Sequence, residues 1–286
     1  MKIGISMDAY LHSTDPVTAV KKLAGIGFDA LDFNFSDYCY EASPLTTDSW
    51  KKLIIDIKNA GNESGIEFSQ MHSPFYMIID SNKFAEFEEM MTIRSFEACS
   101  ILDAKWAVIH PKRFDAGITK ENYEQTRSFN IERVQKLCKQ AKEFGIGIAL
   151  ENIFRFSKEL VNEGINQITD IIDIVDNSNC ENLCVCLDTG HAFYEKISPA
   201  DAARSFGNRV KVLHVDDNTG ESDQHVAPFV GNINWNEFMI ALHDIKYNDV
   251  FSLEIHNYVQ RMPDEIIDDA VEIAYKIAKY LVKQQT

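Results

Sequence analysis

The sequence has no apolar run long enough to span a bilayer and no low-complexity tract. Its hydrophobic fraction of 45% and charged fraction of 25% are ordinary for a globular chain, which disfavours a membrane-spanning or disordered protein. The first residues, MKIGISMDAY, reach an acid at Asp8 before an apolar signal region can develop. We therefore expect a cytoplasmic protein with no membrane partner.

Cysteines and basic residues are both scarce. Six cysteines in 286 residues do not make a disulfide framework, and in a reducing compartment we expect thiols. Cys184 and Cys186 form a C-x-C pair on a predicted strand, where two small core residues on one strand face are favoured over metal ligands. Lysine and arginine number 28 against 44 acidic residues, a net charge of −16. Such a field repels phosphate backbones, so nucleic acid is not expected as a partner.

A glycine-rich phosphate loop is also missing after the first predicted strand, where the chain runs Met7-Asp8-Ala9-Tyr10. This absence disfavours an open doubly wound sheet that binds a dinucleotide. The chain does have an alternation, repeated eight times, of short apolar, β-branched runs and longer segments with helical periodicity. We predict an α/β protein with one domain over residues 1–286, a single (β/α)8 TIM barrel, for which about 250 residues is typical.

The predicted strands and helices alternate along the whole chain. The strands are Ile3–Met7, Ala30–Phe33, Ile66–Met71, Trp106–Ile109, Gly147–Leu150, Leu183–Leu187, Val210–Leu213 and Val250–Leu253. The helices lie near 15–26, 46–62, 83–102, 121–144, 165–176, 198–207, 234–246 and 264–282. Loops that follow the strands of a parallel barrel build its active site, so the long segment 215–233 is expected to be functional.

Metal-ligand residue types follow the last six predicted strands. The first residues beyond strands three to eight are His72, His110, Glu151, Asp188, His214 and Glu254. With 44 acidic residues and 8 histidines in 286 positions, chance gives such a run about 1% of the time, even when each boundary slips by one residue. Carboxylates and imidazoles gathered at one barrel mouth would repel or desolvate one another unless a cation neutralised them. We therefore predict a divalent metal site, with zinc and manganese equally favoured.

Basic residues near two of these positions are candidate substrate-binding groups. Lys112 and Arg113 follow His110, and Arg155 follows Glu151. Each could hold a phosphate or carboxylate of the substrate, with a solvated loop charge as the alternative.

Two acids and three histidines near the strand ends are harder to assign. Asp216 and Asp217 follow His214 closely enough to orient it or a second metal ion, with surface solvation as an equal alternative. The remaining histidines look like ordinary helix or loop residues and are placed outside the site: His12, His243 and His256.

Eight segments in order carry a resemblance to a known family. They are AGIGFDALDF, MHSPF, VIHP, GIALEN, CLDTGHA, VLHVDDN, SDQHVAPFVGNINW and FSLEI, spread over nearly the whole chain. Together they resemble the sugar phosphate isomerase/epimerase superfamily of xylose-isomerase-like barrels, which also includes the metal-dependent apurinic endonucleases. No single segment is highly specific, but their order is.

In the isomerase and epimerase branch, the resemblance implies one metal ion held by four residues, Glu151, Asp188, His214 and Glu254. It also implies that Glu151 and Glu254 stand on opposite faces of the substrate as acid and base. The metal polarises a carbonyl, and the paired carboxylates take and return the proton of the neighbouring C–H. The leading prediction is an isomerase or epimerase of a small sugar, sugar phosphate or polyol derivative.

In the endonuclease branch, the resemblance implies up to three zinc ions and five further ligands, His72, His110, His191, Asp223 and His225. The alternative prediction is therefore a metal-assisted hydrolase or lyase, such as an endonuclease-like phosphodiesterase or a lyase acting on oxidised glycosides. One ion is favoured and three are allowed. Asp223-Gln224-His225 stands where ketose epimerases generally carry an arginine, which argues against a simple ketose 3-epimerase. Related barrels often form dimers or tetramers, so a homo-oligomer is also an option.

Overall fold

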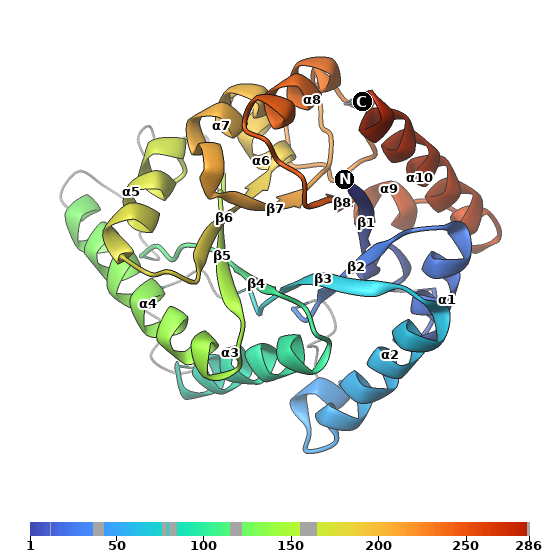
Figure 1. Ribbon diagram of the computed structural model, residues 1–286, viewed down its shortest axis with the longest axis horizontal. Helices are drawn as coiled ribbons and strands as arrows, with labels where there is room; N and C mark the ends of the chain where they lie inside the picture. The colour runs from blue at the N-terminus through green and yellow to red at the C-terminus, as the bar shows by residue number, and fades with distance from the viewer. Residues whose placement is uncertain are drawn as a thin grey trace.

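The computed structural model describes residues 1–11, 13–36, 43–75, 79, 85–114, 122–154 and 165–284. Its strands form one parallel sheet in the order β7-β6-β5-β4-β3-β2-β1-β8. Their bounds are β1 Lys2–Ser6, β2 Ala30–Asn34, β3 Glu67–His72, β4 Trp106–Ile109, β5 Gly147–Glu151, β6 Leu183–Asp188, β7 Val210–His214 and β8 Val250–Leu253. The backbone N–H of Val215 bonds to Ser252 O at 2.8 Å, and that of Glu254 bonds to Val215 O at 3.0 Å. These bonds join β7 to β8, and the (β/α)8 barrel is confirmed (Figure 1).

Helices surround the ring of strands (Figure 1). They are α1 Pro16–Ile26, α2 Trp50–Ser64, α3 Ala85–Ile101, α4 Tyr123–Glu143, α5 Ile168–Ser178, α6 Thr189–Tyr194, α7 Pro199–Phe206, α8 Trp235–Asp244, α9 His256–Gln260 and α10 Ile267–Lys283. Short 3-10 turns include η1 Met7–Tyr10, η2 Pro44–Thr46, η4 Gly207–Arg209 and η5 Asp264–Ile266. The sequence pattern did not predict α6 or α9, because elements of five or six residues are too short to show a helical period. In the part of the chain described here, no helix is long and apolar enough to cross a membrane.

The barrel interior is filled by small apolar side chains. Val108, Ala149, Cys184, Cys186 and Val212 form a buried cluster, against which the half-buried Trp106 packs. The two cysteines thus lie in the core from the same strand face, as the period of two predicts. A second and larger core lies between the strands and the helices.

Five strands, β2, β3, β5, β6 and β7, end one residue later than predicted, and in the last four the added residue is a predicted metal ligand. His72, Glu151, Asp188 and His214 are the last residues of their strands rather than the first residues beyond them. They still pair in register, since Glu151 lies opposite Cys186 and Asp188 lies opposite His214. These polar residues lie at the mouth of the barrel, but the hydrogen-bonded pairing of the β-strands continues through them. The side chains are therefore held by rigid sheet rather than by loops.

The first strand is displaced in the opposite direction. It was predicted as Ile3–Met7 but spans Lys2–Ser6, and Met7 begins the 3-10 turn η1. As a result, Asp8 lies inside a fully buried turn directly above the end of β1.

Candidate metal centre and pocket

Four buried side chains meet at the centre of the barrel mouth. Each offers one ligand atom, and these atoms all lie within 4.8 Å of one another: Glu151, Asp188, His214 and Glu254. His214 is the hub, because its Nδ1 is 3.1 Å from Glu151 Oε1 and 3.2 Å from Glu254 Oε2. The four residues come from β5, β6 and β7 and from the position directly after β8, so four elements fix the arrangement.

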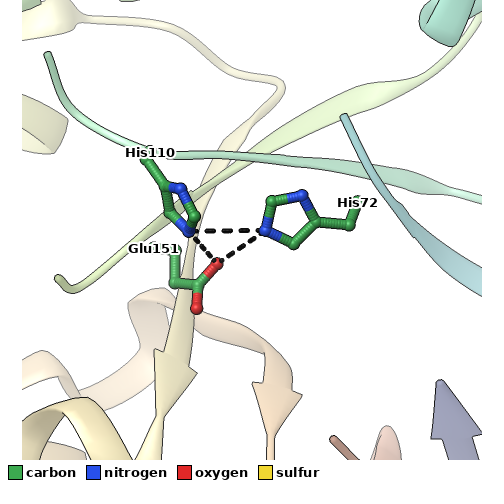
Figure 2. A group of neighbouring side chains, drawn as sticks. All are labelled: His72, His110 and Glu151. Atoms are coloured by element: carbon green, nitrogen blue, oxygen red, sulfur yellow. Dashed lines mark hydrogen bonds and ion pairs between the residues drawn. The ribbon is translucent and has the colours of Figure 1, made fainter. Parts of the chain in front are cut away.

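A second group shares Glu151. His110 Nε2 lies 2.8 Å from Glu151 Oε2, and His72 Nε2 lies 3.4 Å from the same oxygen. Figure 2 shows both imidazoles, which come from β3 and from the residue after β4, pointing at this one carboxylate. The three residues are buried and form a second set with metal-ligand geometry.

A third group lies on the other side of the mouth. His225 Nε2 is 3.0 Å from Asp223 Oδ2, and His191 Nε2 is 3.6 Å from that same oxygen. His191 belongs to α6, whose first turn is capped by Asp188, since Asp188 Oδ1 accepts a bond from the backbone N–H of His191 at 2.6 Å. Asp188 therefore connects the central group to the third one. The structure brings all nine predicted ligand residues into one neighbourhood, and their binding of metal stays a prediction.

A cavity of about 330 Å³ opens onto these groups. Its described lining consists of Asn34, Ser36, His72, Phe75, His110, Glu151, Ile153, Phe154, His191, Asp223, His225, Glu254 and His256. This volume is at the small end of the range for small-molecule sites. It suits a ligand with few carbon atoms.

The two glutamates titrate in opposite directions. Burial raises the pKa of Glu151, but the imidazoles of His214 and His110 outweigh burial and bring the pKa well below its usual value. Burial also raises the pKa of Glu254, and the negative charges of Glu151 and Asp188 raise it further. The pKa of Glu254 therefore lies well above its usual value. Two carboxyl groups with pKa values driven apart are the usual mark of an acid and base pair.

The histidines also divide. Burial lowers the pKa of His110 to about 4. Burial also lowers the pKa of His214 and of His191. The surrounding acidic groups outweigh burial, so the pKa of each imidazole is raised well above its usual value. When no cation is bound, the negative charge of the neighbouring acidic groups therefore favours the protonated form of these two imidazoles.

The donor set fits a divalent cation. Five buried carboxylate oxygens have no hydrogen-bond partner among the described residues: Asp8 Oδ1, Asp32 Oδ1, Asp188 Oδ2, Asp216 Oδ2 and Asp223 Oδ1. An unsatisfied buried carboxylate oxygen is costly, and a bound cation removes that cost. Mixed imidazole and carboxylate ligands suit zinc, manganese, cobalt or iron(II) better than calcium or magnesium. Cys186 is also near, since it falls within ligand distance of Glu151 and His214.

Residues from the first strands complete the site, and the sequence pattern did not select them. Asp32 on β2 is buried, with its Oδ2 3.0 Å from His214 Nε2 and 2.9 Å from Gln70 Nε2. Asn34 and His256 line the cavity. The placement of His256 outside the site was therefore wrong. The acidic and amide residues at the end of the second strand, Asp32 and Asn34, are the sequence signal for this side of the site.

Asp216 and Asp217 are fully buried, so surface solvation is excluded for both. Asp217 organises the loop after β7, because its carboxylate accepts bonds from Phe229 N at 3.0 Å, Ile233 N at 3.1 Å and Trp235 Nε1 at 2.9 Å. Asp216 instead fixes the first turn of α6, through Thr189 and Gly190.

The Asp216 carboxylate accepts a bond from Gly190 N at 2.9 Å. An added Cβ at Gly190 would collide with that carboxylate. Glycine at this position therefore lets the two segments approach, and the contact sets the position of Asp188 and His191 on either side of the turn.

The predicted basic substrate contacts are not part of the described pocket. Lys112 Nζ lies 2.6 Å from Glu88 Oε2 on α3, and Arg113 Nη1 donates to Phe114 O at 3.4 Å. Neither residue is among those that line the cavity. Arg155 lies outside the described residues.

Comparisons with known proteins agree with this architecture. A family model described as xylose isomerase-like TIM barrel matches residues 20–277. An uncharacterized protein of Methanocaldococcus jannaschii is 25% identical, with 96% of this chain and 90% of that protein covered. The D-psicose 3-epimerase of Ruminiclostridium cellulolyticum is 28% identical, with 82% of this chain and 76% of that protein covered. Among solved structures, the IOLI protein with a bound zinc atom gives a TM-score of 0.80 at 18% identity and covers 100% of this chain and 99% of its own.

Proposed function

Since the chain belongs to the xylose isomerase-like TIM barrel family, we propose that it is a divalent-metal-dependent isomerase or epimerase of a small sugar or polyol derivative. The observation that carries this proposal is the position of Glu151 and Glu254. Both carboxylates lie within 3.2 Å of the same His214 nitrogen, and both line one small cavity. The direct test is turnover of D-psicose, D-tagatose, D-fructose and the polyol ketone inosose by the chain loaded with zinc or manganese. Failure on all four with either metal would count against this activity.

The residues that would hold the metal are Glu151, Asp188, His214 and Glu254. When bound, a divalent cation polarises a substrate carbonyl and makes the neighbouring C–H more acidic. We propose that His214 fixes the two glutamates relative to each other, since it contacts both. Asp32 in turn holds the opposite nitrogen of the His214 ring at 3.0 Å and so sets the orientation of the imidazole.

The two glutamates would move the proton. Glu254 is the more basic of the two carboxylates, because the pKa of Glu254 is raised and that of Glu151 is lowered. In an epimerisation one carboxylate removes the carbon-bound proton on one face and the other carboxyl group returns a proton on the opposite face.

Metal binding is expected to release protons. When no cation is present, the pKa values of His214, His191 and Glu254 are all raised, so each group keeps its proton to a higher pH than usual. Ligation requires the deprotonated forms. Apparent zinc affinity should therefore rise as pH rises from about 6 to about 8. Titration calorimetry in two buffers of different ionisation enthalpy measures the number of protons released. Proton uptake, or an affinity that does not depend on pH, would contradict this account of the cluster.

A second candidate function, a metal-assisted hydrolase or lyase, is favoured by one observation. Several further candidate ligand groups surround the central one, among them His72–His110–Glu151, His191–Asp223–His225 and His225–Glu254–His256. Sites with several metal ions clamp both the attacking and the leaving oxygen of a phosphoester. The number of ions bound therefore separates the two functions.

Changing His225 to Ala separates them further. On the isomerase account, this variant keeps the primary ion and mainly raises the substrate concentration required. On the hydrolase account, it loses one ion and most activity together. Elemental analysis and steady-state kinetics on the same preparation measure both effects. His243, an exposed histidine on α8, provides the matched control when it is changed to Ala.

A further inference from the structure

The pocket has a polar edge that the proposed proton transfer does not use. Asn34 at the end of β2, Ser36 just beyond it and His256 at the start of α9 all line the cavity. Asp8 lies behind them in the turn after β1 and is fully buried. We call Asp8, Asn34, Ser36 and His256 the β1 edge.

Asp8 organises the β1 edge. Its Oδ2 lies 3.4 Å from Nδ1 of His256 and accepts a bond from Nδ2 of Asn34 at 3.5 Å. Its backbone oxygen accepts a bond from Gln260 Nε2 at 3.4 Å, which ties α9 to the same turn. One buried carboxylate therefore positions two side chains that face the cavity, from two separate elements.

The β1 edge is next to the chemistry. The rings of His256 and His225 are 4.3 Å apart between centroids, and Glu254 is two residues before His256. A substrate held beside Glu254 therefore extends toward this edge.

The chemistry of this edge matches hydroxyl groups. Imidazole, amide and hydroxyl groups both donate and accept hydrogen bonds, as a sugar hydroxyl does. No lysine or arginine is among the described residues that line the pocket, and the charge fixed behind this edge is the Asp8 carboxylate. A phosphate placed here would meet the like charge of Asp8 and no lysine or arginine from the described lining.

We propose that His256 and Asn34, held in place by Asp8, are specificity-determining residues that hydrogen-bond hydroxyl groups of an uncharged polyhydroxy substrate. This inference rests on the proposed function and adds to it the residues that select the substrate. His256 and Asn34 touch the substrate, and Asp8 is a positioning residue that acts through them.

The test uses the metal-loaded full chain and whichever of D-psicose, D-tagatose, D-fructose or inosose it converts. His256→Ala should raise KM by about tenfold, the effect of one lost hydrogen bond of about 1.4 kcal/mol, while kcat stays within about threefold. Asn34→Ala should raise KM by a similar factor. Asp8→Asn should raise KM less, because the amide keeps an oxygen that can still lie against Nδ1 of His256. His256→Asn should raise KM less than His256→Ala does, and His243→Ala should have the KM of the wild type.

Metal content is the second readout. Each variant should bind as many ions as the wild type, because these residues are assigned to the substrate. If His256→Ala loses an ion, His256 is a metal ligand and the inference is overturned. A fall in kcat with KM unchanged would also overturn it, since that result places His256 in the proton transfer.

Substrate charge gives the third readout. For a converted ketose, wild-type KM should be at least about tenfold higher for its terminal phosphate ester. Preference for the phosphate ester overturns this inference and leaves the isomerase proposal standing. Turnover of neither form by any member of the panel overturns the proposed function, and this inference with it.

Discussion

Replacement of Glu254 by Gln is expected to lower kcat by about 100- to 10,000-fold, the usual contribution of a general acid or base. Gln keeps the size of the side chain and one oxygen that can face the cation, but it removes the charge and the titrating proton. The fold should persist, because the backbone N–H of Glu254 still bonds to Val215 O and joins β7 to β8. Metal affinity should fall only moderately. Steady-state kinetics with saturating zinc or manganese, together with elemental analysis, measure the two effects separately.

The control for this experiment is Glu237→Gln, the same chemical change at an exposed position on α8. It should leave kcat, KM and metal content at wild-type values. If Glu254→Gln keeps full kcat, the carboxyl of Glu254 carries no proton in the reaction. If it loses the ion completely, its effect on turnover is due to metal loss and the acid and base assignment is not supported.

Replacement of Asp188 by Asn is expected to remove the primary ion and, with it, nearly all activity. Asp188 Oδ1 caps α6 through His191 N, whereas Oδ2 is the buried oxygen without a hydrogen-bond partner. Asn keeps an oxygen for the cap and removes the negative charge that we assign to the metal. Since loss of an outer-shell partner already costs about 10- to 100-fold in metal affinity, loss of this ligand should cost at least about 100-fold.

The matched control is Asp15→Asn, because Asp15 caps α1 by accepting a bond from Thr18 N at 3.0 Å and lies on the surface. Both variants should unfold cooperatively near the wild-type Tm when metal is absent. Zinc should then raise the Tm of the wild type and of Asp15→Asn but not that of Asp188→Asn. A normal rise in the Tm of Asp188→Asn would show that Asp188 does not bind the cation.

The positions of the metal-ligand candidates could be predicted because the barrel itself places them. A parallel barrel gathers the ends of all its strands at one rim, so residues such as His72 and Glu254 converge whatever the loops do. An error of one residue at the end of β5 or β6 left this conclusion intact, since Glu151 and Asp188 still point into the mouth.

The pocket residues near β1 could not be predicted from the positions of the strand ends. Asp8 lies two residues past its strand, in a four-residue turn with no periodicity that sequence could show. His256 belongs to a five-residue helix, and its role depends on the tertiary contact with Asp8.

Sequence could not show where the side chain of Lys112 lies, for a similar reason. A long side chain that follows a strand can turn in several directions, and its partner Glu88 is on a different helix. Tertiary packing decides such contacts, and the local sequence does not record it.

Exchange of a carbon-bound substrate proton with solvent is the measurement that tests the central claim most directly. The metal-loaded chain is incubated in deuterium oxide with each of the four ketones, and the product and recovered substrate are analysed by NMR. We expect deuterium at the carbon next to the carbonyl, in step with isomerisation or epimerisation, and neither exchange nor turnover in Glu254→Gln or in the metal-stripped wild type. Confirmed turnover without any deuterium incorporation, by a chain that binds three metal ions, would contradict the proton-transfer account and favour the hydrolytic function.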